Sequence, residues 1–230
     1  MTAIASNLQA VKRSITQVAL RAIRRPEDIT LLAVSKTFSA DAVRTAYEAG
    51  QRAFGENYLQ EALDKMAALV DLPLEWHFIG PIQSNKTRPI AENFAWVHSV
   101  DRLKIAERLS AQRPPDKPAL SICLQVNVSG EDSKSGVAAD DLLELAQAVA
   151  RLPNIKLRGL MAIPAPAREI GEQRLPFAQL RELMRRLNAQ GLGLDTLSMG
   201  MSPDLEAAVL EGATIVRVGT AIFGDRIYRS

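Results

Sequence analysis

A repeated switch in hydrophobic periodicity constrains the fold of this chain more than any other feature. Short runs of β-branched, aliphatic and aromatic residues alternate with longer stretches whose apolar residues recur at helical spacing. The short runs predict eight strands, at residues 30–36, 53–57, 75–80, 96–100, 121–128, 157–163, 196–202 and 215–219. Strands that alternate with helices favour a parallel sheet with right-handed crossovers, and eight such units close into a (β/α)8 barrel.

The stretches between these runs predict the helices. After the first strand, Ser39 is placed to cap a helix and Gly50 to end it. Similar periodicity predicts helices at residues 56–70, 84–92, 102–111, 138–151, 172–190 and 203–211. Residues 1–23 alternate apolar and polar residues at helical spacing, which predicts an additional N-terminal helix that packs on the barrel. They lack the continuous apolar segment of a signal peptide.

Length and local motifs favour one barrel domain over residues 1–230. At 230 residues, the chain is long enough for one large core, whereas two domains would each be small. A doubly wound sheet is the alternative fold. Its usual G-x-G-x-x-G turn is absent after the first strand, where Ser35, Lys36 and Thr37 stand instead. Residues 164–171 form the longest break and predict a loop over the barrel mouth.

Charge and cysteine content narrow the class of protein. The 28 Lys and Arg residues exceed the 26 Asp and Glu residues only slightly and form no basic tract, so a nucleic-acid partner is not expected. No stretch approaches 18 apolar residues, so no membrane span is expected. The single cysteine, Cys123, cannot form an internal disulfide, which predicts a cytoplasmic, reducing environment.

Lys36 stands at the end of the first predicted strand, behind an apolar run at residues 31–34. In a barrel, functional groups collect at the carboxyl ends of the strands. A lysine partly desolvated there favours its neutral form, which suits Schiff-base formation with a carbonyl compound. From its position alone, the alternative is a lysine that merely leaves the core for water.

The segments after the last two predicted strands favour an anion site. Ser202 is placed as a helix N-cap and Pro203 as the first helical residue, while Gly200 permits close approach. Gly219 and Thr220 form a second small turn, and barrels commonly hold phosphate in these two loops. Either turn alone is also compatible with ordinary turn chemistry.

Arg217 and Asn57 are two further candidates. Arg217 shares a strand face with Gly219 and so would line the mouth, where its partner would be a cofactor ring nitrogen, a phosphate or a barrel carboxylate. Asn57 either lines the mouth after the second strand or caps the following helix.

Two other kinds of site are not favoured. His77 and His98 are the only histidines, are interpreted as far apart, and lack the spacing of a zinc site. Cys123 is interpreted as a buried apolar residue and not as a nucleophile.

Several segments resemble a known family over nearly the whole chain. They are residues 31–36 (LLAVSK), 54–58 (FGENY), 76–86 (WHFIGPIQSNK), 127–129 (NVS), 133–136 (SKSG), 158–164 (RGLMAIP), 198–202 (SMGMS) and 216–224 (VRVGTAIFG). In these segments the chain resembles the pyridoxal phosphate homeostasis protein family. The resemblance implies an alanine racemase-like TIM barrel, of fold type III, that binds pyridoxal 5'-phosphate (PLP), a form of vitamin B6.

The resemblance also implies roles for individual residues. Lys36 would hold PLP as a Schiff base, Arg217 would face the pyridine nitrogen, and Asn57 would line the ring. The phosphate would be held by Ser198, Met201, Ser202, Gly219 and Thr220. No metal site is implied.

The function implied by the resemblance is intracellular PLP homeostasis, in which PLP is buffered or delivered without robust turnover. An arginine at the pyridine nitrogen weakens the ring as an electron sink. The second base of related racemases, a tyrosine, comes from an additional β-domain that is not expected here. We expect a monomer whose partners are PLP and PLP-dependent apo-enzymes.

Two alternatives to this function stay open. One is a PLP-dependent amino-acid racemase, with Tyr58 or His77 as the second base. The other is a PLP-free barrel that binds a sugar phosphate and uses Lys36 as an aldolase-type amine. A second, looser PLP site near Lys86 or Lys134 is weighed against ordinary solvated loops, and the loops are preferred.

Overall fold

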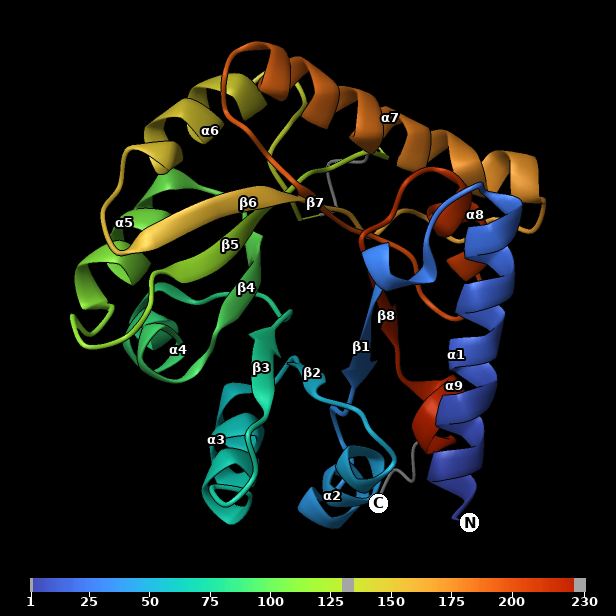
Figure 1. Cartoon of the computed structure of the whole chain (residues 1–230). Coiled ribbons are helices and arrows are strands. Elements are labelled where there is room, and N and C mark those ends of the chain that lie inside the picture. Colours follow the sequence, from blue (N-terminus) through green and yellow to red (C-terminus); the bar gives the residue numbers. More distant parts are fainter. Residues whose placement is uncertain (1, 130–134, 226–230) are drawn as a thin grey trace.

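A closed barrel of eight parallel strands forms the centre of the molecule (Figure 1). The computed structural model describes residues 2–129 and 135–225. Each strand pairs with the next one in sequence, and the eighth pairs with the first. The strands are β1 (Thr30–Val34), β2 (Ala53–Glu56), β3 (Glu75–Phe78), β4 (Trp96–Val100), β5 (Leu120–Gln125), β6 (Ile155–Met161), β7 (Thr196–Ser198) and β8 (Ile215–Val218). The predicted (β/α)8 barrel is therefore confirmed.

Helices surround this barrel. They are α1 (Ala3–Arg21), α2 (Ala40–Glu48), α3 (Leu59–Ala68), α4 (Thr87–Asn93), α5 (Leu103–Gln112), α6 (Leu142–Ala150), α7 (Ile170–Ala189), α8 (Leu205–Leu210) and α9 (Thr220–Phe223). Within the described ranges, two short 3-10 turns accompany them, η1 (Pro26–Asp28) and η2 (Ser84–Lys86). The additional N-terminal helix α1 lies beside α8 and α9 (Figure 1). None of the helices within the described ranges is long and apolar enough to span a bilayer.

Strand alternation divides the buried side chains into two layers. On β3, Trp76 and Phe78 belong to the large apolar core between strands and helices, so His77 between them faces the barrel interior. A separate small apolar cluster of Leu32, Ala53 and Ile215 belongs to the opposite face from that core. The interior therefore combines a small apolar cluster with buried polar side chains.

The start of α8 differs from the prediction. Ser202 was predicted to cap a helix that begins at Pro203, but α8 begins at Leu205 and its N-cap is Asp204. A carboxylate oxygen of Asp204 instead accepts a hydrogen bond from the Met201 N–H at 2.5 Å. Gly200, at φ +92°, turns the chain directly after β7. The predicted cap was wrong because residues 202–204 form a turn, so the helix begins two residues later than predicted.

Two other cap predictions have clear outcomes. Ser39 does cap α2, because its hydroxyl accepts a hydrogen bond from the Ala42 N–H at 3.3 Å. Asn57 does not cap α3, since that helix has Tyr58 at its N-cap. The alternative interpretation of Asn57 as a helix cap is therefore wrong.

Candidate functional site

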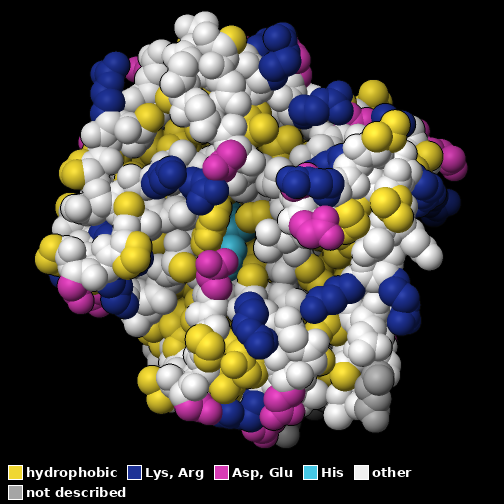
Figure 2. All heavy atoms as spheres, viewed as in Figure 1, with side chains coloured by type: hydrophobic (Ala, Val, Ile, Leu, Met, Phe, Trp, Pro, Cys, Tyr) yellow, Lys and Arg dark blue, Asp and Glu magenta, His cyan; other side chains and the backbone are white. Residues whose placement is uncertain are grey.

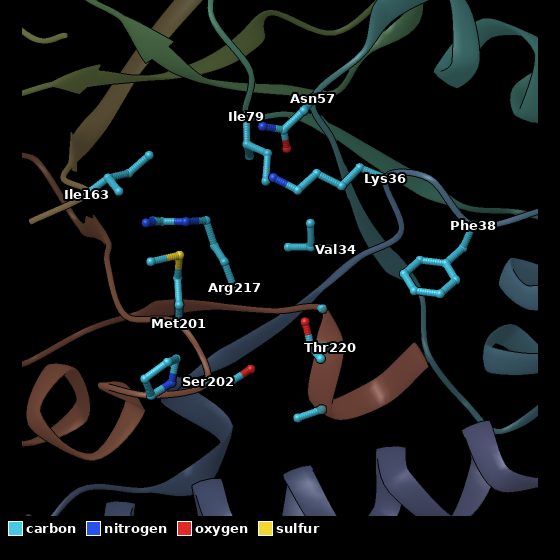
Figure 3. A pocket seen from close by; sticks show the side chains of 13 residues that line it. Val34, Lys36, Phe38, Asn57, Ile79, Ile163, Met201, Ser202, Arg217 and Thr220 are labelled. Atoms are coloured by element: carbon cyan, nitrogen blue, oxygen red, sulfur yellow. The ribbon is translucent and has the colours of Figure 1, made fainter. Parts of the chain in front are cut away.

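A cavity of about 600 Å³ opens at the carboxyl ends of the strands (Figure 3). Its wall comes from the carboxyl-terminal parts of β1 and β8 and from the segments that follow β1, β2, β3, β6, β7 and β8. The lining residues are Val34, Lys36, Phe38, Asn57, Ile79, Ile163, Met201, Ser202, Pro203, Arg217, Gly219, Thr220 and Ala221. This volume lies within the range of small-molecule and cofactor sites, roughly 300–1,000 Å³.

Lys36 lies on the turn directly after β1, and its half-buried side chain extends into the cavity beside Asn57 and Ile79 (Figure 3). The next residue, Thr37, has a φ of +70°, in the left-handed region that non-glycine residues rarely adopt. Such a conformation persists only where its surroundings hold it. The contacts of the neighbouring residues supply this restraint.

A buried ionic cluster clamps the Lys36 turn from behind. The Lys65 ammonium, on α3, donates to the backbone carbonyl of Ser35 at 2.7 Å. It also contacts carboxylate oxygens of Glu56 at 2.7 Å and Glu61 at 2.6 Å. The same Glu61 oxygen accepts the Thr37 N–H at 2.6 Å. We name Glu56, Glu61 and Lys65 the ionic clamp, because they hold the backbone on both sides of Lys36.

Burial makes the ionic clamp sensitive to the loss of any member. Lys65 is 5% exposed and Glu56 fully buried. Burial raises the pKa of Glu56, while Lys65 opposes this shift. The second carboxylate oxygen of Glu56 is buried without a hydrogen-bond partner in the described part of the chain. A charge in such a place depends strongly on its counter-ion.

Arg217 reaches the cavity from β8, and Ser198 and Ala162 hold its guanidinium by hydrogen bonds. One terminal nitrogen donates to the backbone carbonyl of Ser198 at 2.7 Å and to its hydroxyl at 2.9 Å. The other donates to the carbonyl of Ala162 at 2.9 Å. Burial lowers the pKa of Arg217 to about 10, so it stays charged at neutral pH. These acceptors are neutral, so the barrel carboxylate that was the alternative partner is not the hydrogen-bonding partner observed.

Two hydroxyl groups lie on the side of the cavity away from Asn57, on Ser202 and Thr220 (Figure 3). Gly219 keeps the wall thin here, because a Cβ on it would lie 3.1 Å from the carbonyl oxygen of Val34. Asn57 has a buried side-chain oxygen with no hydrogen-bond partner within the described residues. That oxygen is an acceptor available to a ligand.

The electrostatics of the cavity favour an anion. Its lining carries two cationic side chains, Lys36 and Arg217, and no carboxylate among the residues that the structure describes there. Most of the remaining wall is apolar. The lower local dielectric strengthens the attraction of these two side chains for a negative charge. The arrangement can therefore hold a small ligand that carries a carbonyl group and a negative charge.

The structure brings most of the predicted site residues to this cavity. Those that line it are Lys36, Asn57, Met201, Ser202, Arg217, Gly219 and Thr220. Ser198 does not line it, since its fully buried side chain lies behind Arg217 and bonds to that guanidinium. Lys134, weighed for a looser second site, lies outside the described residues, and Lys86 is exposed on η2.

The interpretation of the two histidines as far apart was wrong. Nδ1 of His77 lies 2.9 Å from Nε2 of His98, and both rings are buried inside the barrel. They occupy inward positions on adjacent strands, so strand parity could have indicated their contact. Within the described ranges no group of three or more His, Cys, Asp and Glu side chains could hold a metal ion.

Cys123 is buried as expected. Burial raises the pKa of its thiol to about 12, which disfavours the thiolate needed for a nucleophile.

Comparison with known proteins gives a consistent family. The model of the alanine racemase N-terminal domain matches residues 3–227. The pyridoxal phosphate homeostasis protein of Pseudomonas aeruginosa is 66% identical over 228 residues, covering 99% of this chain and 98% of that protein. Its Escherichia coli counterpart is 53% identical over 231 residues, with 99% of both chains covered.

Solved structures agree with this result. PipY of Synechococcus elongatus, solved with PLP bound and without it, is 42% identical, with a TM-score of 0.84 and coverage of 96% of this chain and 100% of that one. Alanine racemase of Corynebacterium glutamicum, at 19% identity and a TM-score of 0.73, shares the fold over 99% of this chain and 63% of its own.

Proposed function

Because the chain belongs to the alanine racemase N-terminal domain family, we propose that it binds PLP in the cavity around Lys36 and serves PLP homeostasis. The observation that carries this proposal is the meeting of a primary amine, a guanidinium and two hydroxyls in one cavity whose described lining has no carboxylate. Relatives that cover almost the whole chain bear the name pyridoxal phosphate homeostasis protein, and the related PipY has been solved with PLP bound.

The residues of the cavity match the chemical groups of this cofactor. When bound, PLP supplies an aldehyde that condenses with a neutral primary amine, with loss of one water molecule. Lys36 provides that amine, and the ionic clamp orients the turn that carries it. Asn57 would offer its side-chain oxygen beside the ring, since that oxygen has no hydrogen-bond partner among the described residues.

The phosphate belongs on the opposite side of the cavity. The hydroxyls of Ser202 and Thr220 line the cavity there and would donate hydrogen bonds to the phosphate, Gly219 would let the backbone approach, and Met201 would close the wall. Ser198 was expected to hold the phosphate as well, but its hydroxyl bonds to Arg217 and His98. We therefore assign Ser198 to the support of Arg217, which faces the ring nitrogen.

The lining supports storage or delivery of PLP over turnover. A racemase needs a second proton acceptor opposite the lysine. Apart from Lys36 and Arg217, the lining residues that the structure describes have no titratable side chain. Tyr58 is half-exposed and outside the lining, while His77 is buried and bonded to Glu75 and His98. Neither is placed to serve as that base.

The same proposal includes the cellular location, the oligomeric state and the partners of the protein. The buried single cysteine fits a reducing cytosol, where free PLP is a reactive aldehyde that benefits from sequestration. We propose that a monomer passes the cofactor to PLP-dependent apo-enzymes.

Borohydride trapping tests the proposed site. Purified protein is mixed with PLP, its visible absorption is recorded, and the reduced adduct is mapped by peptide mass. We expect a new absorption band and a reduced adduct on Lys36, both lost in Lys36→Ala. Lys86→Ala, which removes an exposed lysine of η2, is the matched control and should keep both signals. An adduct that persists in Lys36→Ala would overturn the site.

A second measurement separates storage from turnover. Exchange of the α-proton of amino acids with deuterated water is followed by NMR at high protein concentration. We expect no exchange above that of free PLP. Steady exchange that disappears in Lys36→Ala would contradict the carrier function and favour the racemase.

A further inference from the structure

A file of polar side chains crosses the barrel interior from Arg217 to the opposite end of the barrel. Ser198 Oγ lies 2.9 Å from the Arg217 guanidinium and 2.7 Å from His98 Nδ1. His98 Nε2 lies 2.9 Å from His77 Nδ1, and His77 Nε2 lies 2.8 Å from a carboxylate oxygen of Glu75. We name Glu75, His77, His98 and Ser198 the histidine file.

The histidine file joins the cavity to solvent at the far end of the barrel. His77, His98 and Ser198 are almost completely buried, whereas the side chain of Glu75, the first residue of β3, is 50% exposed. Figure 2 shows a histidine side chain at the bottom of a hollow, with acidic side chains beside it. The end of the file at Glu75 is therefore open to solvent, while its other end holds a cavity residue.

The arginine end favours one direction for the hydrogen bonds in the file. A guanidinium only donates, so Ser198 Oγ accepts from Arg217, and we place the Ser198 proton toward His98 Nδ1. His98 Nδ1 then carries no proton, and its Nε2–H donates to His77 Nδ1. By the same rule His77 carries its proton on Nε2 and donates it to Glu75.

The carboxylate end independently dictates the same direction. An ionised carboxylate only accepts, so His77 must present Nε2–H to Glu75. If His77 is neutral, its Nδ1 accepts from His98 Nε2–H, and His98 Nδ1 accepts from the Ser198 hydroxyl. The arrangement that the carboxylate requires for both rings is thus also the one that the guanidinium favours.

Packing and charge hold the rings in this arrangement. The ring of His77 stacks on Trp96 at 5.5 Å and 3°, and His98 meets the same indole edge-on at 5.8 Å. Burial lowers the pKa of both histidines, that of His98 well below its usual value, and for His98 the nearby His77 and Arg217 add to this effect. The hydrogen bond from His77 lowers the pKa of Glu75, and the charge of Arg158 adds to it.

We propose that Glu75 is a positioning residue for Arg217, and that it acts through the histidine file by fixing the tautomers of both histidines and hence the acceptor that Ser198 presents to the guanidinium. The file would hold the guanidinium against the ring nitrogen without a carboxylate among the described lining residues of the cavity. The inference about the ring rests on the proposed function, whereas the order within the file does not.

NMR of ¹⁵N-labelled histidine and arginine side chains tests the file in protein without added ligand. The sequence contains only two histidines, so His77→Gln and His98→Gln assign the two rings. At pH 7.5 we expect both rings to be neutral with the proton on Nε2. A protonated ring, or a proton on Nδ1 of either histidine, would overturn the proposal.

Glu75→Lys reverses the polarity at one end and places obligate donors at both. We expect a new Nδ1–H population at His98, two links away, and a shifted Arg217 side-chain signal. Glu75→Gln keeps an acceptor and should preserve the wild-type signals. Glu107→Lys makes the same charge change on an exposed residue of α5 and is the matched control. Unchanged His98 and Arg217 signals in Glu75→Lys would overturn the proposal.

Ser198→Ala gives a second test if Glu75→Lys does not fold. This substitution removes the hydroxyl that links His98 to Arg217, so Glu75 alone then dictates the tautomers of the two histidines. We expect His77 to keep its proton on Nε2. Transfer of that proton to Nδ1 would show that Glu75 does not control the file.

Titration with PLP tests the consequence for the cavity. We expect Glu75→Lys to weaken PLP binding by about 2- to 30-fold, the usual range for coupling through intermediate residues, while Glu107→Lys binds like the wild type. Equal affinity in Glu75→Lys would overturn the positioning role. Failure of the wild type to bind would instead contradict the proposed function, and the histidine signals would still decide the order of the file.

Discussion

Two polar clusters lie behind the cavity, and each holds one of its two cationic residues by different physics. The ionic clamp behind Lys36 consists of full charges, Lys65 with Glu56 and Glu61, and grips backbone atoms. The histidine file behind Arg217 consists mainly of neutral side chains. In this file, the donor and acceptor roles in one hydrogen bond set those in the next. Charges fix a position strongly at short range, whereas dipoles transmit orientation across the barrel at a lower desolvation cost.

Loss of Lys65 should have the largest effect, because the charged cluster cannot tolerate a missing partner. Lys65→Met leaves Glu56 buried without its counter-ion, and we expect a loss of about 3–5 kcal/mol in the free energy of unfolding. Urea denaturation at pH 7.5 measures this loss. Lys104→Met, at an exposed lysine of α5, should change stability little. A loss below 1 kcal/mol in Lys65→Met would show that water already compensates Glu56.

Interruption of the histidine file should cost less. His98→Leu leaves His77 Nδ1 without a partner, at about 1–3 kcal/mol for a buried group, while the Ser198 hydroxyl loses His98 and keeps its bond to Arg217. We therefore expect a loss of about 1–3 kcal/mol in urea denaturation. His98→Gln, which restores a donor and an acceptor, should recover part of it. Equal stability of the two variants would mean that packing, and not hydrogen bonding, explains the loss.

The pH dependence of stability should distinguish the two clusters. Both histidines have lowered pKa values in the folded protein, so the unfolded chain binds protons first as the pH falls below about 6.5. The stability that the two neutral histidines give to the folded protein is complete above that pH and is lost as the pH falls. Between pH 7.5 and 5.5 the wild type should lose about 1–3 kcal/mol more than His77→Gln/His98→Gln. Parallel pH curves for the two proteins would contradict neutral buried histidines.

A matched pair of glutamate substitutions should give the smallest effect and the sharpest contrast. Glu75→Gln changes a half-exposed carboxylate and keeps an acceptor, so we expect a change within about 0.5 kcal/mol. Glu56→Gln removes the buried charge opposite Lys65 and should cost several times more. Chemical denaturation of both variants in one buffer makes the comparison. Similar losses would erase the distinction between a charged and a dipolar cluster.

Much of the fold was predictable because its signals are local. The change of period between strand and helix located all eight strands, although every strand except β4 ends earlier than predicted. Strand parity and the end of the first strand placed Arg217 and Lys36 near the mouth, where the structure also has them. The turn after β7 was harder, since Asp204 bonds to the Met201 N–H and delays the helix.

Sequence by itself determined the barrel, the lysine and the small residues of the mouth, since each depends on neighbours within a few positions. Tertiary structure alone decided the partners behind them. His98 and Ser198 are 100 positions apart and meet because barrel closure brings inward residues of β4 and β7 together. From the sequence alone, Lys65 is expected at a surface position of a helix. In the structure, α3 places its ammonium against the carbonyl of Ser35. Such contacts depend on how a closed sheet and its helices share one interior, which local spacing does not encode.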